Sequence, residues 1–437
     1  MKVSRLRTQV GRVSRVWLWP SFLIILAAMI VDFGHRPQPA GIDFHTYLAA
    51  ARIGASSGWS HLYDQGLVAA QQAMLAPTQH AQPYLSPPPV AWLATALIAL
   101  PFNWAYAIWA IATIGLLAAA VVWSAPGGAP ARSFAALLVI APLWVLQAGY
   151  LGQVVLLVAA AIVVAWRLLR DQHDVAAGLV LALVLLKPNT AFVVPLVLLV
   201  SGRYRVFVTF SLAAAAIAGA ALLTAGTHAL DAYFTQLLQP PPGTNAVSVE
   251  AALGISGPLA LAVRFAILGV VLASAWKSRT SPGQVMVLGT LASLLVTPYL
   301  HVCDLCLLAA AGWILWEERP ALVWRVLLAA SWVIASPFVD ISGLGPTQNR
   351  WPLFELLWLV ALVATAYYWS GRNGNAADRR PYELRSWRAR SATGLSTNSP
   401  SAVRVAAPRD ASNAASTRLA QASSSGVGAN TALMIGT

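Results

Sequence analysis

The sequence predicts an all-α polytopic membrane protein, a bundle of about 12 transmembrane helices. Of its 437 residues, 58% are hydrophobic and only 10% are charged, whereas about a quarter of the residues of an ordinary soluble protein are charged. Apolar runs near or above the ~18–20 residues that cross a bilayer recur along the chain. The runs do not alternate between apolar and polar residues, so they do not resemble the strands of a membrane barrel.

Basic residues gather at the two ends of the chain. The formal net charge of +13 and the pI of about 10.3 suggest a nucleic-acid partner at first. Basic flanks beside hydrophobic segments are instead the usual mark of cytoplasmic termini, so we expect no nucleic acid. We expect a basic cytoplasmic N-terminus (1–15), a transmembrane domain (16–370) and a disordered, basic cytoplasmic tail (371–437) that attracts anionic membrane lipids.

Twelve apolar runs are candidate transmembrane spans. They cover residues 16–34, 104–124, 133–148, 153–169, 175–187, 190–201, 206–224, 259–276, 283–299, 303–316, 321–337 and 352–370. The first run lacks a small-residue cleavage site, and more membrane protein follows it. We therefore expect a retained span rather than a signal peptide.

One more apolar piece, residues 85–101, is not expected to cross the membrane. Two cytoplasmic termini require an even number of spans, and counting this piece as a span makes the number odd. Its prolines, Pro87 to Pro89, also disfavour a continuous helical entry. The first outer loop is therefore expected to carry an interfacial helix here.

The same loop holds the most informative acid of the sequence. Asp43 follows the first span in a chain that has only 15 acidic residues. An Asp at this point caps the helix that follows it, or it acts as a general base at the membrane face. The two roles are compatible. Asp64 closes the loop and is expected to cap a helix or pair with a cation.

Three cationic or hydrogen-bonding side chains are predicted on the same outer face. Lys187 lies in a Lys-Pro-Asn turn between two short apolar segments, where an unpaired charge is costly. His301 begins a later span, and Arg350 precedes the last span, against the usual charge pattern of outer loops. Each is a candidate phosphate ligand. The alternatives are a lysine that reaches the membrane surface and a packed interfacial histidine.

Two further polar residues are candidates for substrate binding. Gln153, in the turn GYLGQ, binds a sugar hydroxyl or serves only the turn. Asn245, with Ser248 in a long outer loop, binds substrate or caps a helix. Cys303 and Cys306 have CxxC spacing, but they lie in an apolar run, so buried thiols are expected rather than a redox or metal site.

No cofactor or metal signature accompanies these residues. The sequence contains no P-loop, no G-x-G-x-x-G pattern and no zinc pattern. One base with several cations favours attack by a hydroxyl group on a centre whose leaving group is a phosphate. Such a reaction needs no soluble nucleotide if the donor is itself a lipid.

Several short motifs follow one another in a fixed order. They are Asp43-x-x-x-Tyr47, LYD, YLSPPPVAWL, QAGYLGQVVLLVAAAIV, AAGLVLALVLLKPN, Asn245-x-x-Ser248 and TPYLHVCDLCLL. From about residue 16 to about residue 370 the chain thereby resembles glycosyltransferase family 87, the DUF2029 group of membrane glycosyltransferases with the GT-C fold. The family usually has Asn after the Gly-Gln pair, where this chain has Val154, and often two His where this chain has only His301.

The resemblance implies a GT-C-like bundle and a transferase that uses no cofactor. The implied donor is a polyprenyl-phosphate-linked sugar, mannose in the α-1,2-mannosyltransferases of the group. The implied acceptor is an envelope lipid or glycan presented outside the cytoplasm. Asp43 matches the acid implied as general base, and Tyr47 belongs to the same motif. The expected location is the cell membrane, with an extracytoplasmic active site.

A non-enzymatic lipid or solute transporter, or an envelope-assembly protein, is the alternative. A transporter places its polar residues near the middle of the bilayer, on broken helices. In this sequence the polar residues are predicted to gather at one face, which favours the enzyme.

Overall fold

The structure, a computed structural model, describes residues 39–238, 247–318, 320–336 and 350–368, and seven residues between 20 and 31. These all belong to one compact unit, Met1–Asn375. Within this part of the chain every regular element is an α-helix or a 3-10 helix. The predicted all-α class is confirmed. The predicted tail, Asn245 and most of the first span lie outside the described residues.

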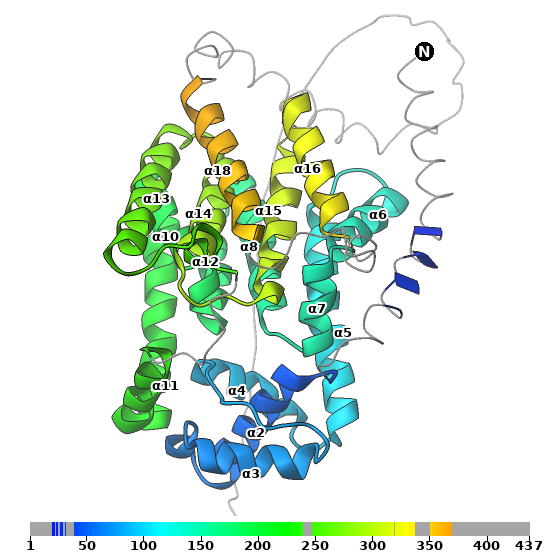
Figure 1. Cartoon of the computed structure of the whole chain (residues 1–437), viewed down its shortest axis with the longest axis vertical. Coiled ribbons are helices and arrows are strands. Elements are labelled where there is room, and N and C mark those ends of the chain that lie inside the picture. The colour runs from blue at the N-terminus through cyan, green and yellow to red at the C-terminus, as the bar shows by residue number, and fades with distance from the viewer. Residues whose placement is uncertain are drawn as a thin grey trace, which may run out of the picture. The chain divides into compact units, whose positions relative to one another are not determined.

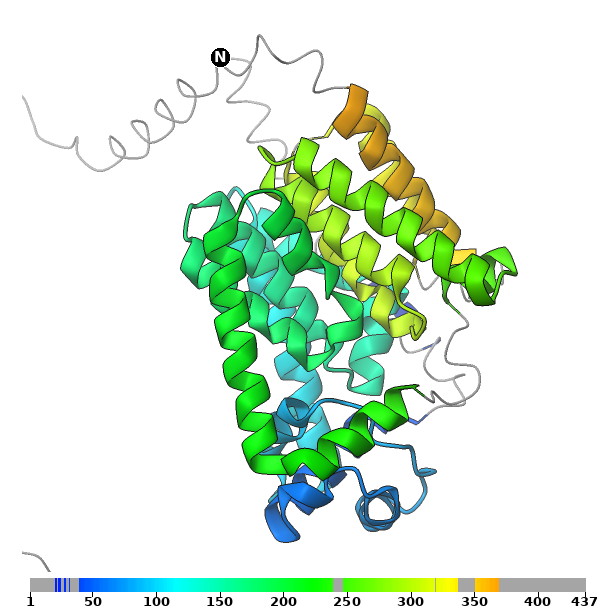
Figure 2. The ribbon, with the colours of Figure 1, turned by 90° about the vertical axis from the view of Figure 1, so that its left-hand side faces the viewer.

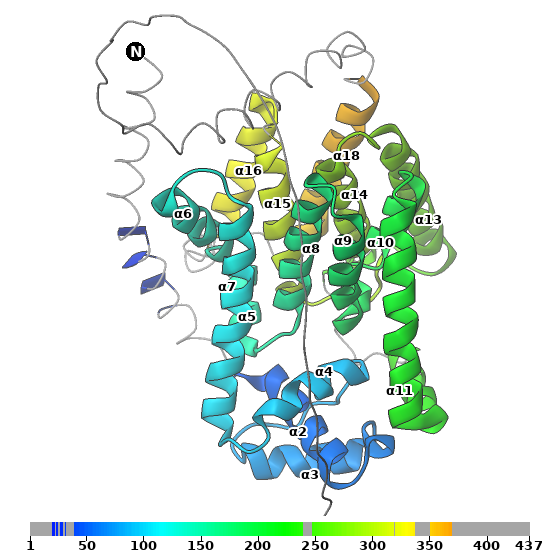
Figure 3. The same ribbon diagram turned by 180° about the vertical axis from the view of Figure 1, so that it is seen from behind.

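A bundle of helices follows residue 101 (Figures 1 and 3). Its helices are α5 (Phe102–Ser124), α6 (Ala129–Ile140), α7 (Leu143–Leu151), α8 (Val155–Arg170), α9 (Asp174–Leu181), α10 (Val193–Val200), α11 (Tyr204–Leu238), α12 (Val249–Leu253), α13 (Gly257–Lys277), α14 (Pro282–Val296), α15 (Cys306–Glu317), α16 (Leu322–Ile334) and α18 (Trp351–Tyr368). The short 3-10 helices η3 (Ala182–Leu186), η4 (Pro188–Thr190) and η5 (Val302–Leu305) connect some of them. Most of α8 is buried, and it packs against α5, α9, α14 and α15.

A cap of short helices, residues 42–97, lies across one end of this bundle (Figures 1 and 3). It contains α2 (Ile42–Ser56), η1 (Trp59–His61), α3 (Gln65–Leu75), α4 (Pro88–Ala94) and η2 (Thr95–Leu97). Helix α11 bends at Gly226, where φ is 78°, and its last part turns across the same end (Figure 2). There the rings of Tyr233 and Tyr63 lie 5.2 Å apart, so the part of α11 after residue 226 packs on the cap.

The predicted count of about 12 spans is not confirmed. Three helices of the described residues are long and apolar enough to cross a bilayer: α5, residues 204–237 of α11, and α13. A fourth span results if α6 and α7 count as one, but these helices are bent by 76°. The expectation of one continuous helix over residues 133–148 is therefore wrong. Pro142 explains the break, because a proline lacks the N–H group and clashes with the preceding turn.

Two predictions about interrupted segments agree with the structure. Helix α4 and η2 together cover ten residues, or ~15 Å at ~1.5 Å per residue, about half of the ~30 Å hydrocarbon core. Residues 85–101 thus contain no helix long enough to cross. The segments around Lys187 are also short, since α9 runs into η3 and α10 has only eight residues.

The long helices expose apolar side chains. Ile111 of α5 is 72% exposed, and Leu212 and Leu223 of α11 are 67% and 88% exposed. A continuous apolar surface of this kind is stable against lipid rather than against water. The apolar helices therefore indicate a membrane protein.

Candidate active site

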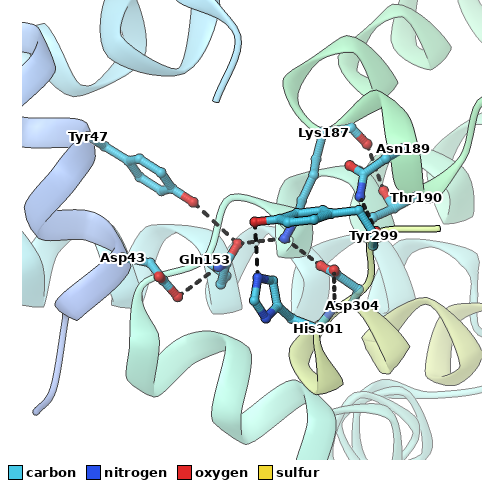
Figure 4. A network of polar contacts seen from close by, with 9 residues as sticks. All are labelled: Asp43, Tyr47, Gln153, Lys187, Asn189, Thr190, Tyr299, His301 and Asp304. Atoms are coloured by element: carbon cyan, nitrogen blue, oxygen red, sulfur yellow. Dashed lines mark hydrogen bonds and ion pairs between the residues drawn. The ribbon is translucent and has the colours of Figure 1, made fainter. Parts of the chain in front are cut away.

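A polar cavity of about 770 Å³ lies between the cap and the bundle. The cap contributes α2 and residues 81–87 to its wall, and the bundle contributes the end of α7, the turn at Lys187 and residues 297–303. The predicted site residues that line it are Asp43, Tyr47, Gln153, Lys187 and His301. Figure 4 shows Asp43 and Tyr47 on one side, Lys187 and His301 on the other, and Gln153 between them.

Two glycines hold the cap against the turn between α7 and α8. Gly41 precedes α2 with a φ of 74°, and its N–H donates to the carbonyl of Tyr150 at 2.8 Å. Gly152 ends α7 with a φ of 75°. These left-handed conformations suit glycine. Asp43, two residues after Gly41, is thereby placed opposite Gln153, the residue after Gly152.

We expect Gly152→Ala to disturb this junction strongly. The left-handed conformation alone costs about 1–3 kcal/mol in other residues, and the added Cβ would lie 2.6 Å from the Cβ of Phe44 in α2. Gly202 is the matched control, because its φ is +84° but nothing lies within 4 Å of its Cβ position. Thermal unfolding in detergent should show a larger loss for Gly152→Ala than for Gly202→Ala. Equal losses would contradict the close packing of the cap on this turn.

Asp43 does not cap its helix. The N-cap of α2 is Gly41, and no side chain bonds to this helix end, so the capping role considered for Asp43 is wrong. Its Oδ2 atom instead accepts from Nε2 of Gln153 at 2.7 Å. Its Oδ1 atom has no hydrogen-bond partner among the described residues. Helix α2 lies outside the spanning helices, and burial raises the pKa of the Asp43 carboxyl above its usual 3.8, although His301 and Lys187 oppose the rise.

The neighbouring acid of the same segment has the capping role. Oδ1 of Asp64 accepts from the backbone N–H groups of Gly66 and Leu67, at 3.0 and 3.1 Å, and so caps α3. This confirms the cap predicted for Asp64. The side chain is exposed and does not line the cavity. Asp64 is therefore a natural control carboxylate for experiments on Asp43.

Gln153 connects the two sides of the cavity. Its Oε1 atom accepts from the Tyr47 hydroxyl at 3.2 Å and from Lys187 Nζ at 2.9 Å, while its Nε2 atom donates to Asp43. The residue is 6% exposed. Gln153 was predicted as a ligand for a sugar hydroxyl, but in this structure its amide bonds to three protein groups.

Lys187 forms an ion pair with Asp304, which was not among the predicted site residues. Its Nζ atom lies 2.5 Å from Oδ1 of Asp304, and the Asp304 side chain is fully buried. The sequence did carry a signal for this pair. Asp304 is an acid inside the apolar run VCDLCLL, and an acid in such a run is costly unless a cation such as Lys187 pairs with it.

His301 lies in the loop before η5, next to Tyr299. Its Nε2 atom is 3.1 Å from the Tyr299 hydroxyl, and its backbone N–H donates to Oδ2 of Asp304 at 3.0 Å. This loop is outside the spanning helices, and burial lowers the pKa of the His301 imidazole below its usual 6.5. Burial thus favours the neutral imidazole, whereas the carboxylates of Asp304 and Asp43 favour the charged form.

The comparison with known families found a match to the middle of the chain. The sequence model of glycosyltransferase family 87 matches residues 84–298. This segment of the chain belongs to glycosyltransferase family 87. No curated protein and no solved structure matches it. Gln153 and Lys187 fall within the matched segment, whereas Asp43, His301 and Asp304 lie on either side of it.

The two other predicted ligands were Arg350 and Asn245. Arg350 is exposed just before α18 and is not among the residues that line the cavity. Asn245 lies outside the described residues. Ser248, its neighbour in the same motif, is the N-cap of α12, where its hydroxyl accepts from the N–H of Ala251 at 3.3 Å.

The cavity combines a carboxylate with a cation and an imidazole. Asp43 offers one carboxylate oxygen that has no protein partner among the described residues. Lys187 and His301 offer a cation and a hydrogen-bonding imidazole nearby. A carboxylate of this kind accepts a proton from an attacking hydroxyl. A cation beside it stabilises negative charge on a departing group.

Proposed function

We propose that this family 87 enzyme transfers a sugar, mannose in our proposal, from a polyprenyl-phosphate donor to an envelope glycolipid or glycan. The reaction takes place on the extracytoplasmic side of the cell membrane, with both basic termini in the cytoplasm. The observation that carries the proposal is the free Oδ1 oxygen of Asp43 in a cavity that also contains Lys187 and His301. Two further candidates, Arg350 for the donor phosphate and Asn245 for substrate binding, are omitted because nothing places them at this cavity.

The proposed chemistry is a single displacement. Oδ1 of Asp43 takes the proton of the acceptor hydroxyl while the hydroxyl oxygen attacks the anomeric carbon of the sugar. The bond between that carbon and the phosphate oxygen breaks, and its electron pair leaves with the polyprenyl phosphate. Lys187 and His301 stabilise the negative charge on the departing phosphate. The proton ends on Asp43, and the configuration at the anomeric carbon is inverted.

A second cavity supports a donor that carries a lipid chain. It is an apolar groove of about 300 Å³ between α6, α15, α16 and α18. Tryptophans provide much of its wall, namely Trp144, Trp313, Trp316, Trp332 and Trp358. Among the residues that the structure describes, no Asp, Glu, Lys, Arg or His lines it. Such a surface suits a hydrocarbon chain.

Two elements contribute residues to both this apolar groove and the polar cavity. On one face of α7, Trp144 lines the groove, and Gln147 and Leu151 line the polar cavity. The second element is η5 with α15: Cys303 lines the polar cavity, and Leu308 lines the groove. We infer that a lipid whose phosphate lies beside Lys187 extends its chain along these elements to the groove.

We expect Ala329→Phe to weaken the binding of long-chain donors. Ala329 lines the apolar groove and is exposed, so a phenyl ring there would occupy space that the chain needs. Ala330 is the matched control, because it is exposed on the same helix but does not line the groove. Ala329→Phe should raise KM for a long-chain donor and leave KM for a short-chain donor unchanged. An equal effect of both variants, or of both chain lengths, would contradict this path.

The donor class is tested by direct transfer. Membranes that contain the protein are given radiolabelled polyprenyl-phosphate-mannose or a nucleoside-diphosphate mannose, together with membrane lipid extract, and the labelled product is identified. We expect transfer from the lipid-linked donor alone. Transfer from the nucleotide donor alone would overturn the proposal. Movement of the labelled lipid across vesicles that survives Asp43→Asn, without any product, would indicate a transporter instead.

A further inference from the structure

We infer that Asp304 is a positioning residue, which holds Lys187 and, through Lys187 and Gln153, fixes the orientation of Asp43 in the cavity. The inference rests on the proposed function, since it assigns a role within the same site. Asp304 itself does not line the cavity, so it acts only through the groups that it holds. Figure 4 shows the chain of contacts from Asp304 through Lys187 and Gln153 to Asp43.

The two carboxylate oxygens of Asp304 contact two different residues of the site, Lys187 and His301. Oδ1 lies 2.5 Å from Lys187 Nζ, and Oδ2 accepts from the backbone N–H of His301 at 3.0 Å. The carboxylate is 0% exposed, and burying such a charge costs several kcal/mol unless a partner offsets it. The pair with Lys187 provides this partner. One buried acid thereby fixes both residues that are proposed to meet the donor phosphate.

Lys187 in turn fixes the amide of Gln153. The oxygen Oε1 faces two donors, Lys187 Nζ and the Tyr47 hydroxyl, at 2.9 and 3.2 Å. If the amide turned over, its NH₂ group would face both donors, and those hydrogen bonds would be lost. The NH₂ group must therefore point at Oδ2 of Asp43, which it meets at 2.7 Å. This leaves Oδ1 as the oxygen available to the acceptor hydroxyl.

The residues of this series of contacts also determine the electrostatic environment of the Asp43 carboxyl. The groups that act on its carboxyl are His301, Lys187, Gln153 and Asp304. Lys187, His301 and the hydrogen bond from Gln153 favour its ionised form, and Asp304 disfavours it. Removing the negative charge of Asp304 should thus lower the pKa of Asp43. Lys187, once released, would also have Asp43 as the remaining carboxylate in this network.

The test compares pH profiles of three variants. Asp304→Asn keeps the shape of the side chain and removes its charge. We expect kcat to fall by about 100-fold, as is typical when reacting groups are misplaced. We also expect the acid limb of the kcat/KM profile to move to lower pH. Gln153→Met removes the donor to Asp43, so the acid limb should move to higher pH. Asp64→Asn keeps an oxygen that can cap α3, so it should change neither value. Opposite shifts in the first two variants support the inference, because a merely structural role would lower the rate without moving the limb.

A second readout does not depend on transfer. The infrared band of the protonated Asp43 carboxyl, assigned by its absence in Asp43→Asn, gives the midpoint of its titration directly. The midpoint should move down in Asp304→Asn and up in Gln153→Met, relative to the unaltered protein. If these shifts occur in a protein that transfers no sugar, the proposed function fails and the link from Asp304 to Asp43 stands. An unmoved or raised midpoint in Asp304→Asn would overturn the inference.

Discussion

Asp43→Asn should reduce sugar transfer by about 10²- to 10⁴-fold, the contribution expected of a general base. The substitution keeps the size of the side chain and an oxygen that can still accept the hydrogen bond from Gln153, which measures 2.7 Å in the structure. It removes the group that takes the proton. We therefore expect the variant to fold and to bind donor normally while turnover is lost. Transfer and donor binding should be measured on the same detergent preparation.

The control for this prediction is Asp64→Asn. Asp64 is an exposed acid of the same cap, and Asn is also a good helix cap. This variant should keep both its thermal stability and its transfer rate. Near-normal transfer by Asp43→Asn would contradict the assignment of Asp43 as the general base.

Lys187→Met should cost both stability and activity. The substitution leaves the buried carboxylate of Asp304 without the partner that lies 2.5 Å from it. Removing one member of a buried ion pair typically destabilises a protein by about 3–5 kcal/mol. Transfer should also be lost, because the donor phosphate loses its cation. Thermal unfolding in detergent and transfer assays measure the two effects separately.

A double variant separates the structural role of Lys187 from its role in transfer. In Lys187→Met/Asp304→Leu both charges are gone, and replacing a buried pair with apolar residues is often neutral or stabilising. We expect the double variant to regain most of the thermal stability lost in Lys187→Met but none of the transfer. Recovery of transfer along with stability would show that Lys187 serves the fold alone.

The sequence predicted the helices of this fold better than their interruptions. Apolar composition is enough to predict that residues 104–124 form a long helix, and α5 covers them. It does not reveal that the segment around Pro142 breaks into two helices bent by 76°. A proline permits either a kink or a complete break, and the packing of neighbouring helices decides between them. The count of spans therefore depends on tertiary contacts that hydropathy does not record.

The sequence predicted those site residues that are polar or charged and lie next to apolar segments. Asp43, Lys187 and His301 are of this kind, and they line one cavity. Arg350 is also of this kind, but a charge beside a span is equally stable on an exposed surface, which is where the structure places it. Asp304 was not included because its role depends on Lys187, which is 117 residues earlier in the chain. Only the folded chain shows that the two side chains meet.

The stereochemistry of the product tests the central claim most directly. If Asp43 acts as a base in a single displacement, a donor of known anomeric configuration must give a product with the opposite configuration. If Asp43 were instead a nucleophile, two displacements would retain the configuration. The measurement is the anomeric configuration of the transferred sugar, determined by NMR on the purified product. Inversion is the predicted result, and retention would contradict the role proposed for Asp43.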